Sequence, residues 1–225
     1  MGSEAGLRER KKQQTRLLIA ETARRLFVER GFEQVSVTEV ANAADVSQAT
    51  VFNYFPTKED LVYSRLESFE AQLLEAVRDR RPGESVLAAV GRFVTEPRGL
   101  LAKNEPEVDA RLRAITAMIR KSPALLARER EIFERYTSAL ADLLAEETGA
   151  RPGDAAPRVV ANALVGIHRA LLDYVRDGVI AGRSGSALSR GMRTQAAQAL
   201  ELLEGGLGRY GVRGGGSEDP PPVVT

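Results

Sequence analysis

The sequence predicts an all-α protein. Apolar residues recur at helical spacing along nearly the whole chain of 225 residues. No run of four or more residues shows the apolar–polar alternation of a strand bounded by turn residues. Proline and glycine instead separate the periodic segments, as they do between helices. A chain of this length buries a substantial core without help from disulfides or metals.

The helices are expected in a regular succession. The first spans about 12–30, with one apolar stripe that includes Ile19 and Phe27, and Gly31 ends it as the residue after the cap. Two short helices follow, and then a longer one that Pro82 and Gly83 end. Further helices are predicted at about 84–103, 106–120, 123–148, 154–181 and 186–204.

Composition excludes much enzyme chemistry. With no cysteine and one histidine, the chain offers neither a thiolate site nor a multi-histidine zinc site. We also find no nucleophile elbow, glycine-rich phosphate loop or paired metal-ligand motif, so we expect a protein that is not an enzyme and uses no metal and no cofactor. No stretch approaches the roughly 20 apolar residues of a membrane span, and the N-terminus lacks a signal-peptide core, which predicts a cytoplasmic protein.

Positive charge is concentrated near the N-terminus, although the formal net charge of the chain is only +1. Between residues 8 and 16 one acid, Glu9, stands against five basic residues: Arg8, Arg10, Lys11, Lys12 and Arg16. An excess of this kind is typical either of a surface that meets phosphate or of a solvated arm. The sequence leaves both readings open.

Residues 36–58 carry signals for three helix starts in a short space. Ser36 and Glu39 form a capping box at the first start. Asp45 and Val46 form a turn, Ser47 caps a second short helix, and Pro56 ends it. Two short helices joined by a tight turn predict a helix-turn-helix, whose second helix enters the major groove of DNA. The alternative is an ordinary helical hairpin.

The second short helix combines an apolar side with residue types that suit DNA. Val51, Phe52 and Phe55 are apolar and are expected to pack, whereas Gln48 and Asn53 can bond to base edges. Thr50 offers a hydroxyl to phosphate or a methyl to thymine, Tyr54 suits a phosphate contact, and Ala49 can remain exposed with them. Thr57 caps the next helix, where the helix dipole and Lys58 are expected to face the DNA backbone.

The run from Arg16 to Leu61, with the pattern AxxLFxxxGFxxVSVTEVAxAADVSxATVFNYFPTKEDL, resembles the DNA-binding domain of the TetR family of transcriptional regulators. The resemblance implies a three-helix domain joined by a long fourth helix to a helical domain for ligand binding and dimerisation. Phe52 stands where the family commonly has tyrosine, which favours packing. The DNA contacts implied by position are Ser36, Val37, Thr38, Ser47, Gln48, Ala49, Thr50, Asn53, Tyr54 and Lys58.

The domain organisation that we expect has four parts: a flexible basic arm at 1–11, the helix-turn-helix domain at 12–58, the larger helical domain at 59–204 and a disordered tail at 205–225. The resemblance implies a homodimer formed by the last two long helices, and a symmetric pair of chains requires a palindromic double-stranded operator. Val160, Leu164 and Leu200 belong to the apolar faces that we expect at that interface.

The resemblance further implies a repressor that a small hydrophobic effector releases from DNA. The segment FNYFPTKEDLV is similar to a branch of the family with acyl-CoA-like ligands, and a lipophilic drug or metabolite is the other reading. The candidate lining is Phe93, Leu112, Ile115, Met118, Phe133, Tyr136, His168 and Tyr174, all of which also fit an ordinary core. A helical adaptor for protein partners is the competing function.

Overall fold

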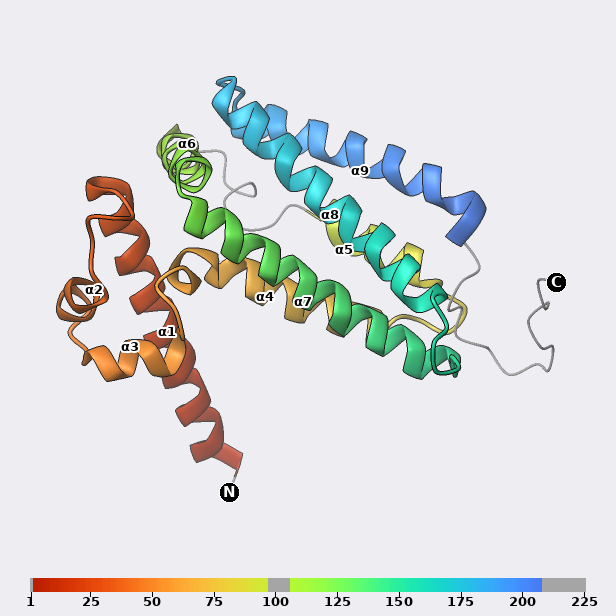
Figure 1. The fold of residues 1–225 in the computed structure, drawn as a ribbon, viewed down its shortest axis with the longest axis horizontal. Coiled ribbons are helices and arrows are strands. Elements are labelled where there is room, and N and C mark those ends of the chain that lie inside the picture. The colour runs from red at the N-terminus through yellow and green to blue at the C-terminus, as the bar shows by residue number, and fades with distance from the viewer. Residues whose placement is uncertain (1, 97–105, 208–225) are drawn as a thin grey trace. The chain divides into compact units, whose positions relative to one another are not determined.

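The computed structural model describes residues 2–96 and 106–207, and within these ranges the chain forms helices and no strand (Figure 1). The prediction of an all-α fold is therefore confirmed. The helices are α1 (Gly2–Arg30), α2 (Val37–Ala43), α3 (Gln48–Tyr54), α4 (Asp60–Arg78), α5 (Val86–Thr95), α6 (Pro106–Lys121), α7 (Pro123–Thr148), α8 (Ala156–Ile180) and α9 (Gly185–Leu207).

The chain divides into two compact units, each assembled from several segments. The first unit contains Met1–Phe69, Lys103–Glu134 and Arg176–Gly185. The second contains Glu70–Ala102, Arg135–Val175 and Ser186–Thr225. The long helices α4, α7 and α8 each contribute residues to both units. The domain boundaries that we expect from the sequence remain a prediction.

The core of the first unit joins the three N-terminal helices to later parts of the chain. Ile19, Phe27 and Val51 are almost fully buried in it, and the rings of Phe27 and Phe32 meet edge to face at a centroid distance of 5.1 Å. Residues from α6 and α7 complete the same core, namely Ile119, Leu125 and Ile132. The short helices α2 and α3 are thus supported by more than their neighbours in sequence.

Helix α1 begins at Gly2, well before the start that we expect at residue 12. The first turns are therefore helical where the sequence analysis predicts a flexible arm. The reason is that the segment is rich in glutamate, arginine, lysine and glutamine, which favour helices, and contains no proline. The Gln13 side chain donates to Glu9 at 3.0 Å, a stabilising pair one turn apart. Gly31, with φ 91°, ends the helix as expected.

In the second unit, close helix contacts depend on two glycines. The side chain of Leu200 on α9 lies against Gly91 on α5, and the hydroxyl of Tyr174 on α8 lies against Gly191 on α9. A Cβ atom at either position would overlap these neighbours. The absence of a side chain therefore allows α9 to pack closely against α5 and α8.

Two helix ends differ from the expectation. Helix α5 ends at Thr95 and α9 continues to Leu207, so residues 205–207 of the predicted tail are helical. The rest of that tail, and residues 97–103 of the predicted helix at 84–103, lie outside the described residues. Among the described helices, none is both long enough and apolar enough to span a membrane.

Candidate nucleic-acid interface

Helix α2 begins with the capping box that the sequence predicts. The backbone N–H of Glu39 donates to Oγ of Ser36 at 3.2 Å, and the backbone N–H of Ser36 donates to Oε2 of Glu39 at 2.8 Å. Arg30 at the end of α1 donates to the same carboxylate at 2.6 Å. The Ser36 backbone N–H and the Arg30 side chain lower the pKa of Glu39 from 4.5 to about 2.

The turn between α2 and α3 bends through a left-handed residue. Asp45 has φ 53°, and among the described residues it is the one residue other than glycine with positive φ. The backbone N–H of Val46 donates to the carbonyl of Ala41 at 3.0 Å and closes the turn. Short polar side chains such as that of aspartate tolerate this conformation better than bulkier ones. The turn therefore lets α3 start directly after α2.

Helix α3 begins at the cap that the sequence predicts. The backbone N–H of Thr50 donates to Oγ of Ser47 at 3.0 Å, and the two hydroxyls are 2.8 Å apart. Val51 and Phe55 hold the helix against the core, where both are almost fully buried. The remaining side of α3 exposes Gln48, Ala49 and Asn53.

The structure corrects the expectation for Phe52. This side chain is 43% exposed and lies one helical turn from Gln48, on the outward side of α3. The packing roles go to Val51 and Phe55, which are one turn apart on the opposite side. The exposed surface of α3 thus contains an aromatic ring in addition to the polar groups, and the sequence analysis did not assign it there.

The other predicted contact residues surround this surface. Ser36, Thr38 and Ser47 are exposed, whereas Val37 and Tyr54 are partly buried and pack against the core. The Lys58 ammonium lies 4.3 Å from the centroid of the Phe32 ring, which is a cation–π contact. Arg16 on α1 has the same relation to Phe55 at 5.0 Å. Lys58 is therefore held near the start of α4.

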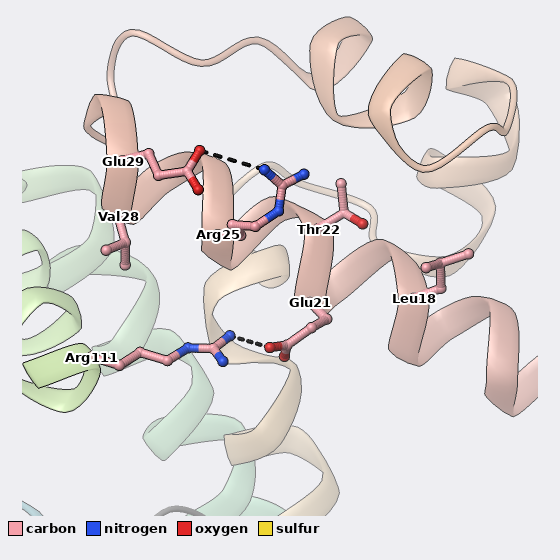
Figure 2. A pocket seen from close by; sticks show the side chains of 7 residues that line it. All are labelled: Leu18, Glu21, Thr22, Arg25, Val28, Glu29 and Arg111. Atoms are coloured by element: carbon pink, nitrogen blue, oxygen red, sulfur yellow. Dashed lines mark hydrogen bonds and ion pairs between the residues drawn. The ribbon is translucent and has the colours of Figure 1, made fainter. Parts of the chain in front are cut away.

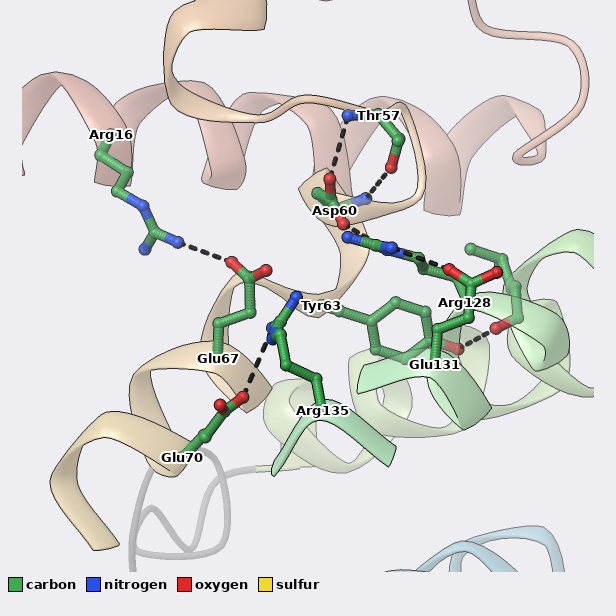
Figure 3. A network of polar contacts seen from close by, with 10 residues as sticks. Arg16, Thr57, Asp60, Tyr63, Glu67, Glu70, Arg128, Glu131 and Arg135 are labelled. Carbon is green, nitrogen blue, oxygen red and sulfur yellow. Dashed lines mark hydrogen bonds and ion pairs between the residues drawn. The ribbon is translucent and has the colours of Figure 1, made fainter. Parts of the chain in front are cut away.

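The start of α4 is fixed in part by Arg128, a residue of α7 that the sequence analysis did not single out. Thr57 and Asp60 cap the helix reciprocally, with N–H to oxygen distances of 2.9 and 3.3 Å (Figure 3). The other carboxylate oxygen of Asp60 accepts from Nε of Arg128 on α7 at 2.7 Å. The Tyr63 hydroxyl donates to the Leu125 carbonyl at 2.9 Å, so α7 is bonded to the first turn of α4 twice. No local pattern near residue 128 signals this contact.

A hollow of about 300 Å³ lies between α1 and α6 (Figure 2). Glu21 in its wall pairs with Arg111 of α6, and Arg25 pairs with Glu29 at 3.4 Å. Partial burial opposes ionisation of Glu21, but hydrogen bonds from Arg24 and Arg111 outweigh it and lower the pKa to about 2. The charged walls make this hollow a poor match for a hydrophobic effector.

The candidate effector residues fall into both compact units. In the first, Ile115 and Met118 of α6 pack against the core around Phe27, and Met118 also lines a second hollow of about 410 Å³. In the second, the rings of Tyr136 and His168 meet edge to face at 6.2 Å. Phe93 and Phe133 are buried, whereas Leu112 and Tyr174 are partly buried. Which of them contact an effector remains a prediction.

Metal binding finds no support in the described part of the chain, where acidic and histidine side chains form no group able to hold an ion. The arrangement is instead that of a helix-turn-helix protein, in which α2 and the turn present the outer surface of α3. A surface of this size, with amide, hydroxyl and aromatic groups, matches the major groove of DNA.

Comparison with known families gives the same result. Residues 19–63 match the bacterial regulatory proteins of the tetR family, and residues 84–205 match the MftR C-terminal domain. The chain belongs to the TetR family of bacterial transcriptional regulators. It is therefore a DNA-binding regulator and not an enzyme.

Two curated relatives align with about two thirds of this chain. The transcriptional regulator TcmR of Streptomyces glaucescens is 30% identical over 146 residues, which are 64% of this chain and 65% of TcmR. The chain thus spans slightly less than two thirds of the length of TcmR. MftR of Mycobacterium tuberculosis, named for mycofactocin biosynthesis, is 27% identical over 154 residues, which are 66% of this chain and 73% of MftR.

Solved structures confirm the fold over nearly the whole chain. GusR of Salmonella enterica superposes with a TM-score of 0.51 at 20% identity, covering 87% of this chain and 96% of GusR. SmeT in its triclosan complex superposes with a TM-score of 0.52 at 17% identity, and the match covers 93% of this chain and 100% of SmeT. At such identities the likeness concerns the fold alone.

Proposed function

We propose that this regulator is a repressor that binds a palindromic operator as a homodimer and is released by a small hydrophobic effector. The observation that carries the proposal is the outward surface of α3, where Gln48 and Asn53 are exposed and take no part in packing the core. Such amides read base edges through paired hydrogen bonds. Because its target is chromosomal or plasmid DNA, the protein acts in the cytoplasm.

The dimer is supported by α8, although by a different face from the one that we expected. Val160, Leu164 and other residues of the expected apolar face are buried within the chain itself, so they do not form an outer surface. A second row of α8 stays accessible and consists of Val159 and three small residues, Ala163, Gly166 and Ala170, of which Ala163 also belongs to the face that we expected. Val159 is 61% exposed and Leu202 on α9 is 84% exposed. Small side chains let two helices approach closely, so we assign this row to the dimer interface.

The effector site is supported by a buried hydroxyl. Tyr136 is 1% exposed, and none of the described residues forms a hydrogen bond with its hydroxyl. A buried polar group without a partner is costly, and a ligand that supplies a hydrogen-bond acceptor removes that cost. The buried Phe93 and the edge-on His168 ring fit a mainly hydrophobic ligand with one polar group. A lipophilic drug meets this description as a whole, and an acyl-CoA-like molecule meets it through its acyl chain and thioester.

Alanine substitutions on α3 test the DNA-binding surface. Duplexes selected by the wild-type protein from a random library serve as the operator, and fluorescence anisotropy measures affinity. We expect Gln48→Ala and Asn53→Ala each to cost about 1–3 kcal/mol, since each removes a base-reading group. Gln198→Ala, an exposed amide on α9, is the matched control and should leave affinity unchanged.

Two results would contradict the proposal. If both α3 variants keep the helix content and the sedimentation behaviour of the wild type and bind the selected duplexes as tightly, another surface reads DNA. If the wild-type protein selects no duplex and sediments as a monomer, a helical adaptor is the better description.

A further inference from the structure

The first turns of α1 form a continuous helix that leaves the core of its unit and exposes a cationic face. Residues 6–14 are all exposed, and α1 passes α3 (Figure 1). The guanidinium of Arg16 lies over the ring of Phe55, the residue that ends α3. Ile19 is the first almost fully buried residue of α1. Arg8 lies about 16 Å before it along the helix axis. The segment therefore projects well beyond the residues that pack it.

Helical periodicity determines which side these charges occupy. Arg8, Lys12 and Thr15 precede Ile19, Ala23 and Leu26 by eleven residues each, which is slightly more than three whole turns. The latter three are among the buried residues through which α1 meets the core shared with α2 and α3. Lys11, one turn before Thr15, lies on the same face. The cationic face therefore projects on the side of α1 where the helix-turn-helix is packed.

These cations are not used inside the protein. Among the described side chains, those of residues 6–96 and 109–206, Arg8, Lys11 and Lys12 form no ion pair, whereas Arg16 pairs with Glu67 at 3.0 Å and Arg10 donates to the Gly6 carbonyl. Glu9, the one acid among residues 6–15, bonds to Gln13 at 3.0 Å. Three charges on one exposed face without partners, directly continuous with the helix-turn-helix, match the phosphate backbone of a duplex.

We propose that Arg8, Lys11 and Lys12 form a second DNA contact, which binds the phosphate backbone beside the segment that α3 reads. The proposal rests on the DNA-binding role of α3 and extends the footprint of each protomer beyond the recognition helix. An anionic membrane fits less well, because Leu7 is the one large apolar side chain among residues 6–15 and an interfacial helix needs an apolar face.

The test is the salt dependence of DNA binding by the full-length protein. A triple variant, Arg8→Gln, Lys11→Gln and Lys12→Gln, removes the charges and keeps good helix formers. The control variant, Arg113→Gln, Arg130→Gln and Arg151→Gln, removes three exposed charges from other parts of the chain. The probe is a 40-base-pair duplex that carries a sequence selected by the wild-type protein, and circular dichroism checks that helix content is retained.

We expect the slope of log affinity against log salt to become shallower by about 0.9 for each phosphate that the triple variant no longer neutralises, and affinity at low salt to fall at least tenfold. The sequence preference should persist, because α3 is intact. Trimming the duplex to the selected sequence should lower the DNA affinity of the wild type to nearly that of the triple variant.

Five outcomes would contradict this account, and they distinguish the second DNA contact from the role of α3. The proposal is wrong if the triple variant has the wild-type salt slope, or if the control variant loses as much DNA affinity as the triple variant. It is also wrong if the triple substitution abolishes binding to phosphatidylglycerol vesicles but leaves DNA binding unchanged. A wild-type protein that binds no duplex refutes the role of α3 itself. Loss of binding in the Asn53→Ala variant together with a wild-type slope in the triple variant refutes the second contact alone.

Discussion

Single residues set the geometry of the helix-turn-helix. Glu39 caps α2 through Ser36 and also binds Arg30, so one carboxylate joins α2 to the end of α1. Asp45 supplies the left-handed turn to α3. Phe52 is turned outward because Val51 and Phe55 fill the inner side of the same short helix. These positions show that a helix of two turns has no spare residues, so each side chain must either pack, cap or face outward.

At this scale we predict a pH effect from Glu39. Its pKa in the folded protein is about 2, below the ordinary 4.5, so the stabilisation is complete above about pH 5 and is lost as pH falls towards 2. In Glu39→Gln the amide oxygen still accepts from Ser36, but the residue no longer titrates. The difference in Tm between wild type and variant, measured by circular dichroism from pH 6 to pH 2.5, should shrink as pH falls.

The other carboxylates titrate equally in the wild type and in Glu39→Gln, so the difference in Tm between them reports the contribution of Glu39 alone. Parallel Tm curves over this range would mean that the contacts with Ser36 and Arg30 do not persist in solution. Glu29→Gln serves as a control, because its exposed pairing with Arg25 at 3.4 Å is weak.

Between helices, packing in the second unit depends on the contact of Tyr174 with Gly191. We predict that Gly191→Ala destabilises the protein by about 1–3 kcal/mol, because the new methyl group overlaps the Tyr174 ring and hydroxyl. Gly205→Ala on the same helix meets nothing within 4 Å and should raise stability by up to about 1 kcal/mol. Urea denaturation measures both.

A double-mutant cycle shows whether the clash is the cause. Tyr174→Phe removes the hydroxyl nearest to Gly191, so Gly191→Ala should cost less when it is combined with Tyr174→Phe than when it is made alone. An equal cost in both cases would place the strain elsewhere. Tyr174 is also a candidate for effector contact, and this packing role is a sufficient reason for its presence at that position.

On the scale of the whole molecule, the start of α4 depends on α7. The Asp60 side chain is 1% exposed and its charge is balanced by Arg128, which also pairs with the exposed Glu131 at 2.8 Å. We predict that Arg128→Ala lowers the free energy of unfolding by about 3 kcal/mol, because it leaves a buried carboxylate without its cation. Glu131→Ala removes the exposed partner instead and should cost less than about 1 kcal/mol.

Chemical denaturation followed by circular dichroism measures these two variants. Affinity for a selected duplex should also fall in Arg128→Ala, because the reciprocal cap of Thr57 and Asp60 encloses Lys58, one of the predicted DNA contacts. If Arg128→Ala and Glu131→Ala have equal, small effects, then α7 does not stabilise the first turn of α4. The buried pair of Glu129 with Arg176, at 2.8 Å, is a further link of α7, in this case with α8.

Features that depend on neighbouring residues could be derived from the sequence alone. Helical periodicity, the caps at Ser36, Ser47 and Thr57 and the glycine at residue 31 are local, so the all-α fold, the helix-turn-helix and the bounds of α7 were predictable. Even the exposed amides of α3 follow from a pattern only seven residues long.

Features that depend on residues distant in sequence were settled by the packing of the helices. The pairing of Asp60 with Arg128, the fit of Tyr174 against Gly191 and the burial of the α8 face around Leu164 each join separate helices. Periodicity tells which residues of a helix share a face, but not which of two apolar faces a neighbour covers. That choice depends on the whole chain, because buried area is gained only where another helix is close enough to exclude water.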